Sequence, residues 1–253
     1  VAAMVSPAVT WESYEGILRY ISDSLGKPYR LIQRRTYREI NDLLLAGEID
    51  LAFVCSGTYA ALPEDAPVEL IAVPVVNDRA VYHSVIIVRD KTPYKTFSDL
   101  RGARFAFSDE LSNTGHIYPR WLLAEAGEEP ASFFSGTIFT GSHDRSILAV
   151  YRHLADGTAV HELVYRAIVV PGSPYWGKLR IIDTSPDFAT PPVVAPVAVP
   201  ADVRARMRNV LLGMGASEEG RARLKPLGFD GFAPAEPADY FPIREMLKTV
   251  EKK

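Results

Sequence analysis

The α/β fold is indicated most clearly by residues 104–116, which read RFAFSDELSNTGH. An apolar run opens this stretch, a polar loop with a glycine follows it, and the next residues have helical spacing. Residues 137–144, TIFTGSHD, have the same order of strand, loop and helix start. Because open α/β sheets bind ligands at the carboxyl ends of their strands, we expect the functional site on these two loops.

The two loops have the composition of a site for a small oxyanion. Each precedes a predicted helix, and helix N-termini present unpaired N–H groups and the positive end of the helix dipole. Ser112, Thr114 and Ser142 add hydroxyl donors, and two further donors are the rings of His116 and His143. We therefore expect two helix N-termini that face one crevice and hold an anion there. For His116, ligand contact and a hydrogen bond to the backbone are equally good interpretations.

Composition and charge narrow the function classes. The 253 residues are 47% hydrophobic and 23% charged, which is typical of a globular protein with one large domain or two ordinary ones. The net charge of −3, with no basic block, argues against nucleic acid and anionic membrane surfaces as partners. No apolar run approaches the length of about 18 residues that a membrane span needs, so we expect no direct membrane insertion. The single cysteine excludes an intrachain disulfide.

The first third of the chain alternates strands and helices. Apolar runs predict strands at residues 1–5, 29–32, 51–54, 68–76 and 81–88. Helical spacing predicts helices at residues 11–25 and 37–45 and a helical turn from residue 56. Thr10 and Thr36 are the expected N-caps, and Gly26 and Gly47 the expected ends. The unbroken apolar run at residues 51–54 is typical of a parallel strand buried on both faces.

A second α/β unit follows, and after it comes a proline-rich segment that returns to the first unit. The expected elements of this unit are residues 97–100, 105–107, 114–126, 137–139, 142–155 and 158–160. The proline-rich segment after it contains the apolar runs 181–183 and 191–199. The C-terminal part is expected to be helical at residues 201–213, 217–226 and 243–250. The alternation breaks near residue 80 and resumes differently near residue 185. The simplest account is a discontinuous lobe 1, residues 1–80 plus 188–253, with lobe 2, residues 81–187, inserted into it. We expect each lobe to be a mostly parallel sheet flanked by helices, with two crossing strands as the hinge.

Five segments of the chain resemble the phosphate/phosphite/phosphonate-binding periplasmic proteins, the solute receptors of phosphonate-type ABC transporters. They are Tyr37 with the helix and strand up to Phe53, and residues 82–88, 99–102, 112–115 and 141–144. The resemblance covers nearly the whole chain and implies a two-lobed type 2 periplasmic binding protein that closes on an oxyanion without a cofactor. It implies a periplasmic location and an ABC permease as partner, or a membrane histidine kinase for the sensory relatives. We expect a monomer.

The resemblance also carries over residue roles. The Ser/Thr-rich anion loop of the family, usually Ser-Thr-Ser-Gly, corresponds to residues 112–115, with Asn113 and Thr114 at its second and third positions. Ser142 and His143 match a Ser-His pair of the family, and Tyr37 matches a tyrosine that reaches the ligand. The expected ligand-binding residues are Ser112, Asn113, Thr114, Gly115, His116, Ser142, His143 and His161 in lobe 2, and Tyr37, Cys55, Ser56 and Thr58 in lobe 1.

Two positions depart from the family pattern. His161 stands near the place where amine-carrying phosphonate receptors hold the ligand's ammonium group with carboxylates, so it disfavours an aminophosphonate. Cys55 stands where many transport receptors have glycine or another small residue, and arsenite-sensing relatives need a cysteine. At the start of a helix, Cys55 could be an activated thiol for trivalent arsenic or a small buried packing residue. Both interpretations stay open.

Catalysis and metal binding find little support in the sequence. Ser142, His143 and Asp144 are adjacent on one helix end, so they cannot form a chain of nucleophile, base and orienting acid. The chain lacks a nucleophile elbow, a Walker loop and a dinucleotide fingerprint, and its five histidines and one cysteine lack zinc spacing. We expect a non-catalytic receptor for phosphate, phosphite or a simple phosphonate. The alternative is a sensory receptor that binds arsenite through Cys55 and signals to a membrane histidine kinase.

Overall fold

The computed structural model describes residues 7–251, which divide into two compact units. Unit 1 comprises Pro7–Val81 and Ala189–Phe241, and unit 2 comprises Tyr82–Phe188 and residues 242–251. The chain passes from one unit to the other within β3 (Val81–Tyr82) and again within β9 (Phe188–Ala189), and these strands pair with each other. The strand predicted at residues 1–5 lies outside the described residues.

Unit 1 contains a four-stranded sheet in the order β1–β10–β2–β11. The strands are β1 (Ala52–Phe53), β2 (Val68–Val75), β10 (Val193–Pro196) and β11 (Gly231–Ala233). Every pair in this described sheet is antiparallel, so the prediction of a mostly parallel sheet, including a parallel strand at residues 51–54, is wrong for unit 1. The reason is that the chain leaves unit 1 after β2 and returns through β10, so these neighbours run in opposite directions.

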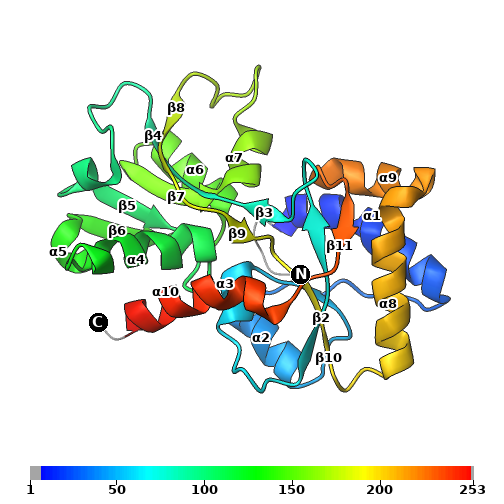
Figure 1. The fold of residues 1–253 in the computed structure, drawn as a ribbon. Coiled ribbons are helices and arrows are strands. Elements are labelled where there is room, and N and C mark those ends of the chain that lie inside the picture. The colour runs from blue at the N-terminus through cyan, green and yellow to red at the C-terminus, as the bar shows by residue number, and fades with distance from the viewer. Residues whose placement is uncertain (1–6, 252–253) are drawn as a thin grey trace. The chain divides into compact units, whose positions relative to one another are not determined.

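Helices cover the sheet of unit 1. They are α1 (Pro7–Leu25), α2 (Tyr37–Leu45), α3 (Ser56–Ala60), α8 (Ala201–Gly213) and α9 (Glu218–Leu224), with 3-10 turns η3 (Met214–Ala216), η4 (Lys225–Leu227) and η5 (Pro237–Tyr240). Helix α8 packs on β2 and β11, whereas α2 contacts β10 (Figure 1). Buried Ile40, Val194 and Leu211 belong to the core of this unit.

The predicted ends of the first two helices are confirmed in part. At α2 the prediction is confirmed: the side chain of Thr36 accepts from the Glu39 N–H, and the Glu39 carboxylate accepts from the Thr36 N–H at 2.8 Å. Helix α1 begins at Pro7, a residue type favoured at the first helical position, so the prediction of Thr10 as N-cap is wrong. Gly26 ends this helix with a positive φ of 66°, as predicted.

The strand predicted at Tyr29–Ile32 is also not observed. A strand exists only where a neighbouring strand takes up its backbone hydrogen bonds, and no described strand pairs with this segment. The segment instead lines a pocket of unit 1, and this pocket is described with the candidate site below.

Unit 2 contains a five-stranded sheet in the order β6–β5–β7–β4–β8. The strands are β4 (Ser84–Arg89), β5 (Arg104–Phe107), β6 (Gly136–Phe139), β7 (Gly157–His161) and β8 (Leu179–Thr184). Strand β5 is parallel to β6 and β7, whereas β4 is antiparallel to β7 and β8, so the sheet is mixed rather than mostly parallel. Since β5, β6 and β7 are parallel, their carboxyl ends share one edge of the sheet.

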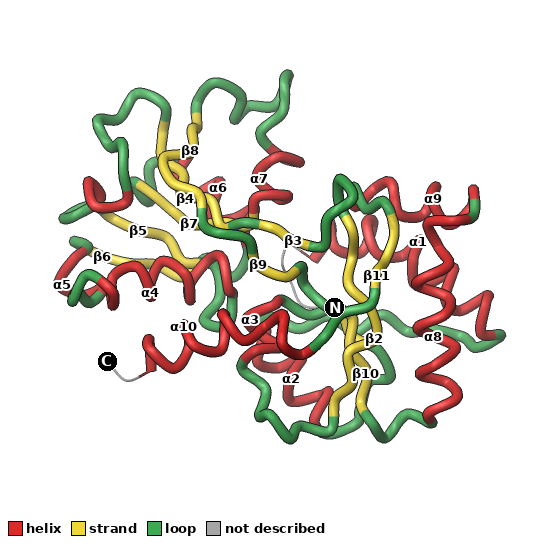
Figure 2. The backbone as a smooth tube through the Cα atoms, viewed as in Figure 1, coloured by secondary structure: helices red, strands yellow, loops and turns green. Residues whose placement is uncertain are grey.

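Helices flank both faces of this sheet (Figure 2). They are the 3-10 turn η1 (Phe97–Leu100), the π-helical turn η2 (Asn113–Ile117), α4 (Tyr118–Glu125), α5 (Pro130–Phe133), α6 (His143–Tyr151), α7 (Glu162–Ile168) and α10 (Phe241–Glu251). Phe105 packs with Phe97 and Phe134 in one core cluster, whereas the next residue, Ala106, packs with Ile147 in a second cluster. This alternation shows that β5 is buried on both faces.

Candidate functional site

The loop after β5 is folded around the Ser112 hydroxyl. Ser112 is the N-cap of η2, and its Oγ accepts a hydrogen bond from the Gly115 N–H at 3.0 Å. The Ser112 carbonyl accepts from two successive N–H groups, His116 at 3.1 Å and Ile117 at 2.9 Å, which makes the first turn a π-turn. The N–H groups at the start of a helix have no intrahelical acceptor, so Asn113 and Thr114 present theirs at this end of the sheet.

Gly115 brings this loop against two other candidate elements. A Cβ atom placed on Gly115 would lie 1.9 Å from Ser108 Oγ and 3.1 Å from His143 Cε1. The Gly115 carbonyl also accepts from the Ser108 N–H at 3.2 Å. Only glycine allows this approach. As a result, the buried side chains of Ser108 and His143 both lie against Gly115.

His143, the first residue of α6, has a defined tautomer. Its Nδ1 accepts from the backbone N–H of His161 at 3.4 Å, so its proton is on Nε2, which lies 3.4 Å from Ser112 Oγ. Burial lowers the pKa of His143 to about 4, so the ring is neutral near pH 7. His143 therefore supplies a neutral N–H donor. The adjacent Ser142 hydroxyl donates to Asp144 Oδ1 at 2.6 Å, so its hydrogen already has an acceptor.

Three buried hydroxyls of unit 2 have donor capacity left over. Ser112 Oγ accepts from Gly115 and faces the Nε2–H of His143, so its own hydrogen has no acceptor among the described residues. Ser108 Oγ and Thr114 Oγ1 are buried and have no hydrogen-bond partner there either. A buried polar group without a partner costs about 1–3 kcal/mol. Hydroxyls of this kind can donate to the oxygens of an anion.

His161 and Tyr82 join this loop through Asn113. His161 is the N-cap of α7, and its Nδ1 accepts from the Leu163 N–H at 3.2 Å, which leaves the ring proton on Nε2. Burial holds the pKa of His161 well below its ordinary value. The ring stacks on Tyr82 with centroids 4.3 Å apart, and Asn113 Nδ2 donates to the Tyr82 hydroxyl at 3.1 Å.

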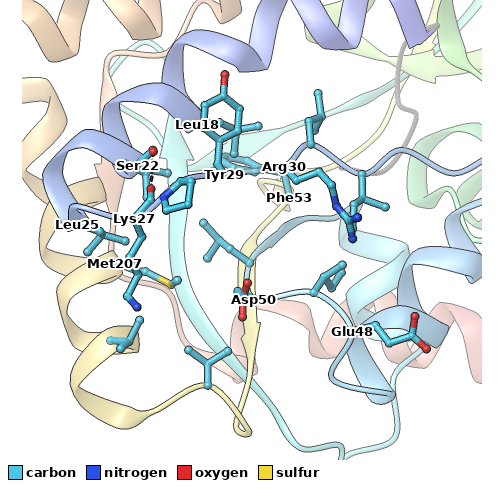
Figure 3. A pocket seen from close by; sticks show the side chains of 18 of the residues that line it. Leu18, Ser22, Leu25, Lys27, Tyr29, Arg30, Glu48, Asp50, Phe53 and Met207 are labelled. Atoms are coloured by element: carbon cyan, nitrogen blue, oxygen red, sulfur yellow. Dashed lines mark hydrogen bonds between the residues drawn. The ribbon is translucent and has the colours of Figure 1, made fainter.

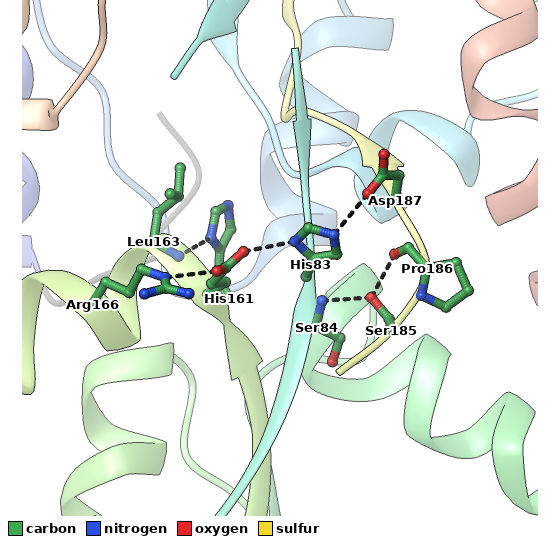
Figure 4. Close-up of polar contacts among 9 residues, drawn as sticks. His83, Ser84, His161, Leu163, Arg166, Ser185, Pro186 and Asp187 are labelled. Atoms are coloured by element: carbon green, nitrogen blue, oxygen red, sulfur yellow. Dashed lines mark hydrogen bonds and ion pairs between the residues drawn. The ribbon is translucent and has the colours of Figure 1, made fainter. Parts of the chain in front are cut away.

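Two carboxylates close to His161 are held by His83 (Figure 4). His83 Nδ1 lies 2.7 Å from Glu162 Oε2, and His83 Nε2 lies 2.7 Å from Asp187 Oδ1. Arg166 Nε donates to the other oxygen of Glu162 at 2.6 Å. Burial by itself would raise the pKa of Glu162, but the hydrogen bonds from His83 and Arg166 outweigh it and hold the pKa below its usual range. Both carboxylates thus already have cationic or N–H partners.

His116 is anchored away from the donor groups by its own loop. Its Nδ1 donates to the Glu110 carbonyl at 2.7 Å, and its ring packs against Phe107 and Phe139 at 5.0 and 5.2 Å. Burial lowers the pKa of His116 to about 4. These contacts correspond to the backbone-bonding role that the sequence left open for this residue.

The candidate residues of unit 1 gather at α2 and α3. Tyr37 begins α2 and is fully buried, and Asn41 Nδ2 of the same helix donates to the Thr58 carbonyl at 2.9 Å. Thr58 Oγ1 and Asn41 Oδ1 are buried without a hydrogen-bond partner among the described residues. The Ser56 hydroxyl donates to the Ala189 carbonyl at 2.7 Å, so its hydrogen already has an acceptor.

Cys55 is the N-cap of α3 and is only 1% exposed. Its thiol forms no disulfide. Within residues 7–251, no group of three or more His, Cys, Asp or Glu side chains is arranged to hold a metal ion. Any soft ligand at Cys55 would therefore have one sulfur as its main protein contact.

A separate pocket of about 540 Å³ lies inside unit 1 (Figure 3). Its walls come from α1, the 27–32 segment, β1 and the start of α8, and they are mostly apolar with Lys27, Arg30, Glu48 and Asp50 among them. None of the predicted site residues lines it. The pocket is therefore distinct from the candidate groups at α2 and α3.

Four polar residues that the structure places at these sites were not predicted as site residues from the sequence. Ser84 Oγ donates to the Thr114 carbonyl at 2.8 Å, and Ser108 lies against Gly115. Asn41 contacts Thr58, and His83 joins the two carboxylates. Only Ser108 had a usable signal, because it is the first residue after β5 and such positions often face a ligand.

Comparisons with known proteins agree with one another. A family model described as "ABC transporter, phosphonate, periplasmic substrate-binding protein" matches residues 1–240. The Phosphate-import protein PhnD of Mycolicibacterium smegmatis is 24% identical over 92% of this chain and 79% of its own length. The Phosphonates-binding periplasmic protein of Escherichia coli is 24% identical over 65% of this chain and 50% of its own length.

Solved structures show the same fold. A binding protein component of an ABC phosphonate transporter from Pseudomonas aeruginosa has a TM-score of 0.91 and 19% identity, covering 99% of this chain and 85% of that one. PhnD1 from Prochlorococcus marinus, in complex with methylphosphonate, has a TM-score of 0.89 and 19% identity, covering 99% and 96%. These likenesses confirm the predicted type 2 periplasmic binding protein fold. No helix in the described part of the chain is long and apolar enough to span a membrane.

Proposed function

This chain belongs to the family of periplasmic substrate-binding proteins of phosphonate ABC transporters, and we propose that it binds a small phosphorus oxyanion for uptake. The ligand is phosphate, phosphite or a simple phosphonate. The observation that carries the proposal is the set of buried hydroxyls at Ser108, Ser112 and Thr114, which have no acceptor in the described part of the chain, together with the neutral Nε2–H of His143 near Ser112. A tetrahedral oxyanion offers several acceptor oxygens to such a set.

The charge distribution of unit 2 favours a simple anion over one that carries an amine. An ammonium group would need carboxylates with free acceptor capacity. Glu162 is already engaged by His83 and Arg166, and Asp187 is engaged by His83. This supports the expectation, made from His161, that an aminophosphonate is not the ligand.

The same proposal covers location, partner and activity. The protein acts in the periplasm as a monomer, delivers its ligand to an ABC permease, and catalyses no reaction. The relatives named above carry phosphate-import and phosphonate-binding names, which support this assignment. Tyr37, Cys55, Ser56 and Thr58 of unit 1 remain proposed ligand residues, together with Asn113, Gly115, Ser142 and His161 of unit 2. We propose that His116 supports the loop, because its Nδ1 donates to the Glu110 carbonyl.

Calorimetric titration of the purified chain with phosphate, phosphite, methylphosphonate and an aminoalkylphosphonate tests the proposal. Thr114→Val should weaken binding of the best ligand by about 1–3 kcal/mol, because it removes one donor to a desolvated anion. Ser173→Ala is the matched control, since Ser173 Oγ is also buried without a partner but lies outside the loop. Equal affinity in the wild type and Thr114→Val, or no binding of any phosphorus oxyanion, would refute the proposal.

Arsenite sensing through Cys55 is the second candidate function, with a membrane histidine kinase as partner. The buried thiol at the start of α3 supports it, beside Thr58, whose hydroxyl has no partner in the described chain. A thermal-shift comparison of the wild type and Cys55→Ser separates the candidates. Stabilisation by arsenite in the wild type alone would establish the sensor, whereas equal stabilisation of both proteins by a phosphorus oxyanion would establish the uptake receptor.

A further inference from the structure

One group in the anion loop differs in kind from its neighbours. Asn113 is fully buried, its Nδ2 donates to the Tyr82 hydroxyl at 3.1 Å, and its Oδ1 has no hydrogen-bond partner among the described residues. The other unsatisfied groups of this loop are hydroxyls, which can donate. An amide oxygen can only accept, so the loop combines several donors with one buried acceptor.

The NH2 group of the Asn113 amide faces the Tyr82 hydroxyl. The Tyr82 ring is stacked on His161 at 4.3 Å and contacts Phe188 at 6.3 Å, so its hydroxyl has a fixed position. Since the amide NH2 group faces this hydroxyl, the oxygen faces away from it. A buried acceptor without a donor is unfavourable, and a ligand that brings its own hydrogen would relieve it.

Resting on the proposed function, we infer that Asn113 Oδ1 accepts a hydrogen bond from the hydroxyl of a singly protonated phosphorus oxyanion. The receptor then selects the P–OH form of its ligand over the fully deprotonated form and over sulfate. Sulfate carries no proton near neutral pH, so it would place an oxygen lone pair against the amide oxygen. Phosphite and simple phosphonates lose their last ionisable proton near neutral pH, whereas phosphate keeps at least one P–OH group there, so each of these ligands can offer the protonated form.

The protein's own titratable groups around η2 are constrained. His143 and His161 stay neutral near pH 7 because burial lowers their pKa, and burial raises the pKa of Tyr118 on α4 to about 12. Asp109 Oδ1 accepts from the Leu111 N–H at 2.9 Å within the loop. His83, next to β4, faces Glu162 and Asp187, and Tyr82 on β3 faces Asn113. A change of sulfate affinity with pH would reveal any titration of these protein groups, because sulfate itself does not titrate near neutral pH.

Calorimetry with methylphosphonate and sulfate, below and above the second ionisation of the phosphonate, provides the test. In the wild type, the apparent affinity for methylphosphonate should fall about tenfold per pH unit above that ionisation, while sulfate stays weak and independent of pH. Binding above the ionisation should also take up close to one proton per ligand, measured from the dependence of the binding enthalpy on the buffer.

Two variants make the assignment specific to the amide. Asn113→Thr replaces the acceptor by a hydroxyl that can donate, so it should bind sulfate more tightly and lose the proton uptake. Tyr82→Phe keeps Asn113 but releases its amide, so it should reduce the preference for the protonated ligand in the same direction. Tight binding of the fully deprotonated ligand by the wild type, without proton uptake, would overturn the inference and leave the proposed function intact. Absence of binding by every phosphorus oxyanion at every pH would overturn the proposed function itself.

Discussion

At the scale of single residues, Gly115 is the most constrained position of the candidate site. Its α-hydrogen is the only substituent that the neighbouring Ser108 hydroxyl leaves room for. The close approach allows the loop to pack directly against Ser108 and His143. The type of residue follows from geometry, whereas the ligand preference depends on the side chains at residues 112–114.

Gly115→Ala should lower both stability and ligand affinity. The added methyl group would lie 1.9 Å from Ser108 Oγ, so the loop must move, at a cost of about 1–3 kcal/mol in the free energy of unfolding. Gly136→Ala is the control, because a Cβ there meets nothing within 4 Å and its φ is not positive. Urea unfolding and calorimetric titration of both variants measure the effect. Equal behaviour of the two variants would contradict the close approach.

Three buried histidines should make the protein sensitive to mild acid. Burial lowers the pKa of His116 and His143 to about 4 and lowers that of His161 as well. A histidine in the unfolded chain has a pKa of about 6.5. The unfolded chain therefore binds more protons than the folded one between about pH 6.5 and about pH 4, and stability should fall as pH decreases through this window.

Urea unfolding at a series of pH values measures this acid sensitivity. His116→Gln should reduce the slope of unfolding free energy against pH by about a third, since one of three histidines is removed. A slope that is flat across the window in the wild type would show that these rings take up protons in the folded state.

At the scale of elements, the sequence predicted what local signals determine. Helix α2 has its N-cap Thr36 and its final Gly47 within eleven residues of each other, and both were predicted correctly. The partner of β1 is β10, which lies more than a hundred residues away, and no local pattern specifies such a pairing. This is why β1, β2 and β10 were located from the sequence but their antiparallel order was not.

The same distinction applies to the candidate site. Ser112 and His143 were predicted from loop composition and from the resemblance, and the structure brings them within 3.4 Å of each other. Ser84 and His83 were missed because their contacts are with residues 30 to 104 positions away in the chain. Residue types that can bind an anion are visible in a sequence, whereas the contacts that orient them are tertiary.

Asp156 connects three strands of unit 2 near their ends. It accepts hydrogen bonds from Arg89, at the end of β4, and from the side chain and N–H of Arg104, at the start of β5, and it lies just before β7. Burial alone would raise its pKa, but these hydrogen bonds outweigh burial and lower the pKa of Asp156 to about 2. Its contribution to stability is therefore present above about pH 4 and is lost between about pH 4 and about pH 2.

Asp156→Asn should reduce the free energy of unfolding near pH 7 by about 1–2 kcal/mol, after allowance for solvent screening. The difference between wild type and variant should shrink as pH falls below about 4, because the wild-type carboxylate is then protonated as well. Glu245→Gln serves as control, since Glu245 forms an exposed ion pair with Lys248. A difference that stays constant down to pH 2 would contradict the assignment.

At the scale of the whole molecule, ligand binding should be visible as added stability. With methylphosphonate at a hundred times its Kd, the free energy of unfolding should rise by about 2.7 kcal/mol. Amide exchange should slow most at residues 108–116 and 142–144, where the candidate donors lie. Thermal shifts and hydrogen exchange measure the two effects together, and a raised Tm without slower exchange at these loops would place binding elsewhere.

Neither unit is built from one continuous stretch of chain, and this has a consequence for biosynthesis. Unit 1 lacks β10, β11 and two of its helices until residues 189–241 have been synthesised, and unit 2 lacks α10 until residues 242–251 have been synthesised. Helix α10 contributes buried Ile243 and Val250, and the Val250 carbonyl accepts from Arg120 of α4. A nascent chain therefore leaves the core of unit 1 unfinished until residues 189–241 are made and that of unit 2 until α10 is made, so chains truncated within α10 should depend most on chaperones and be degraded first.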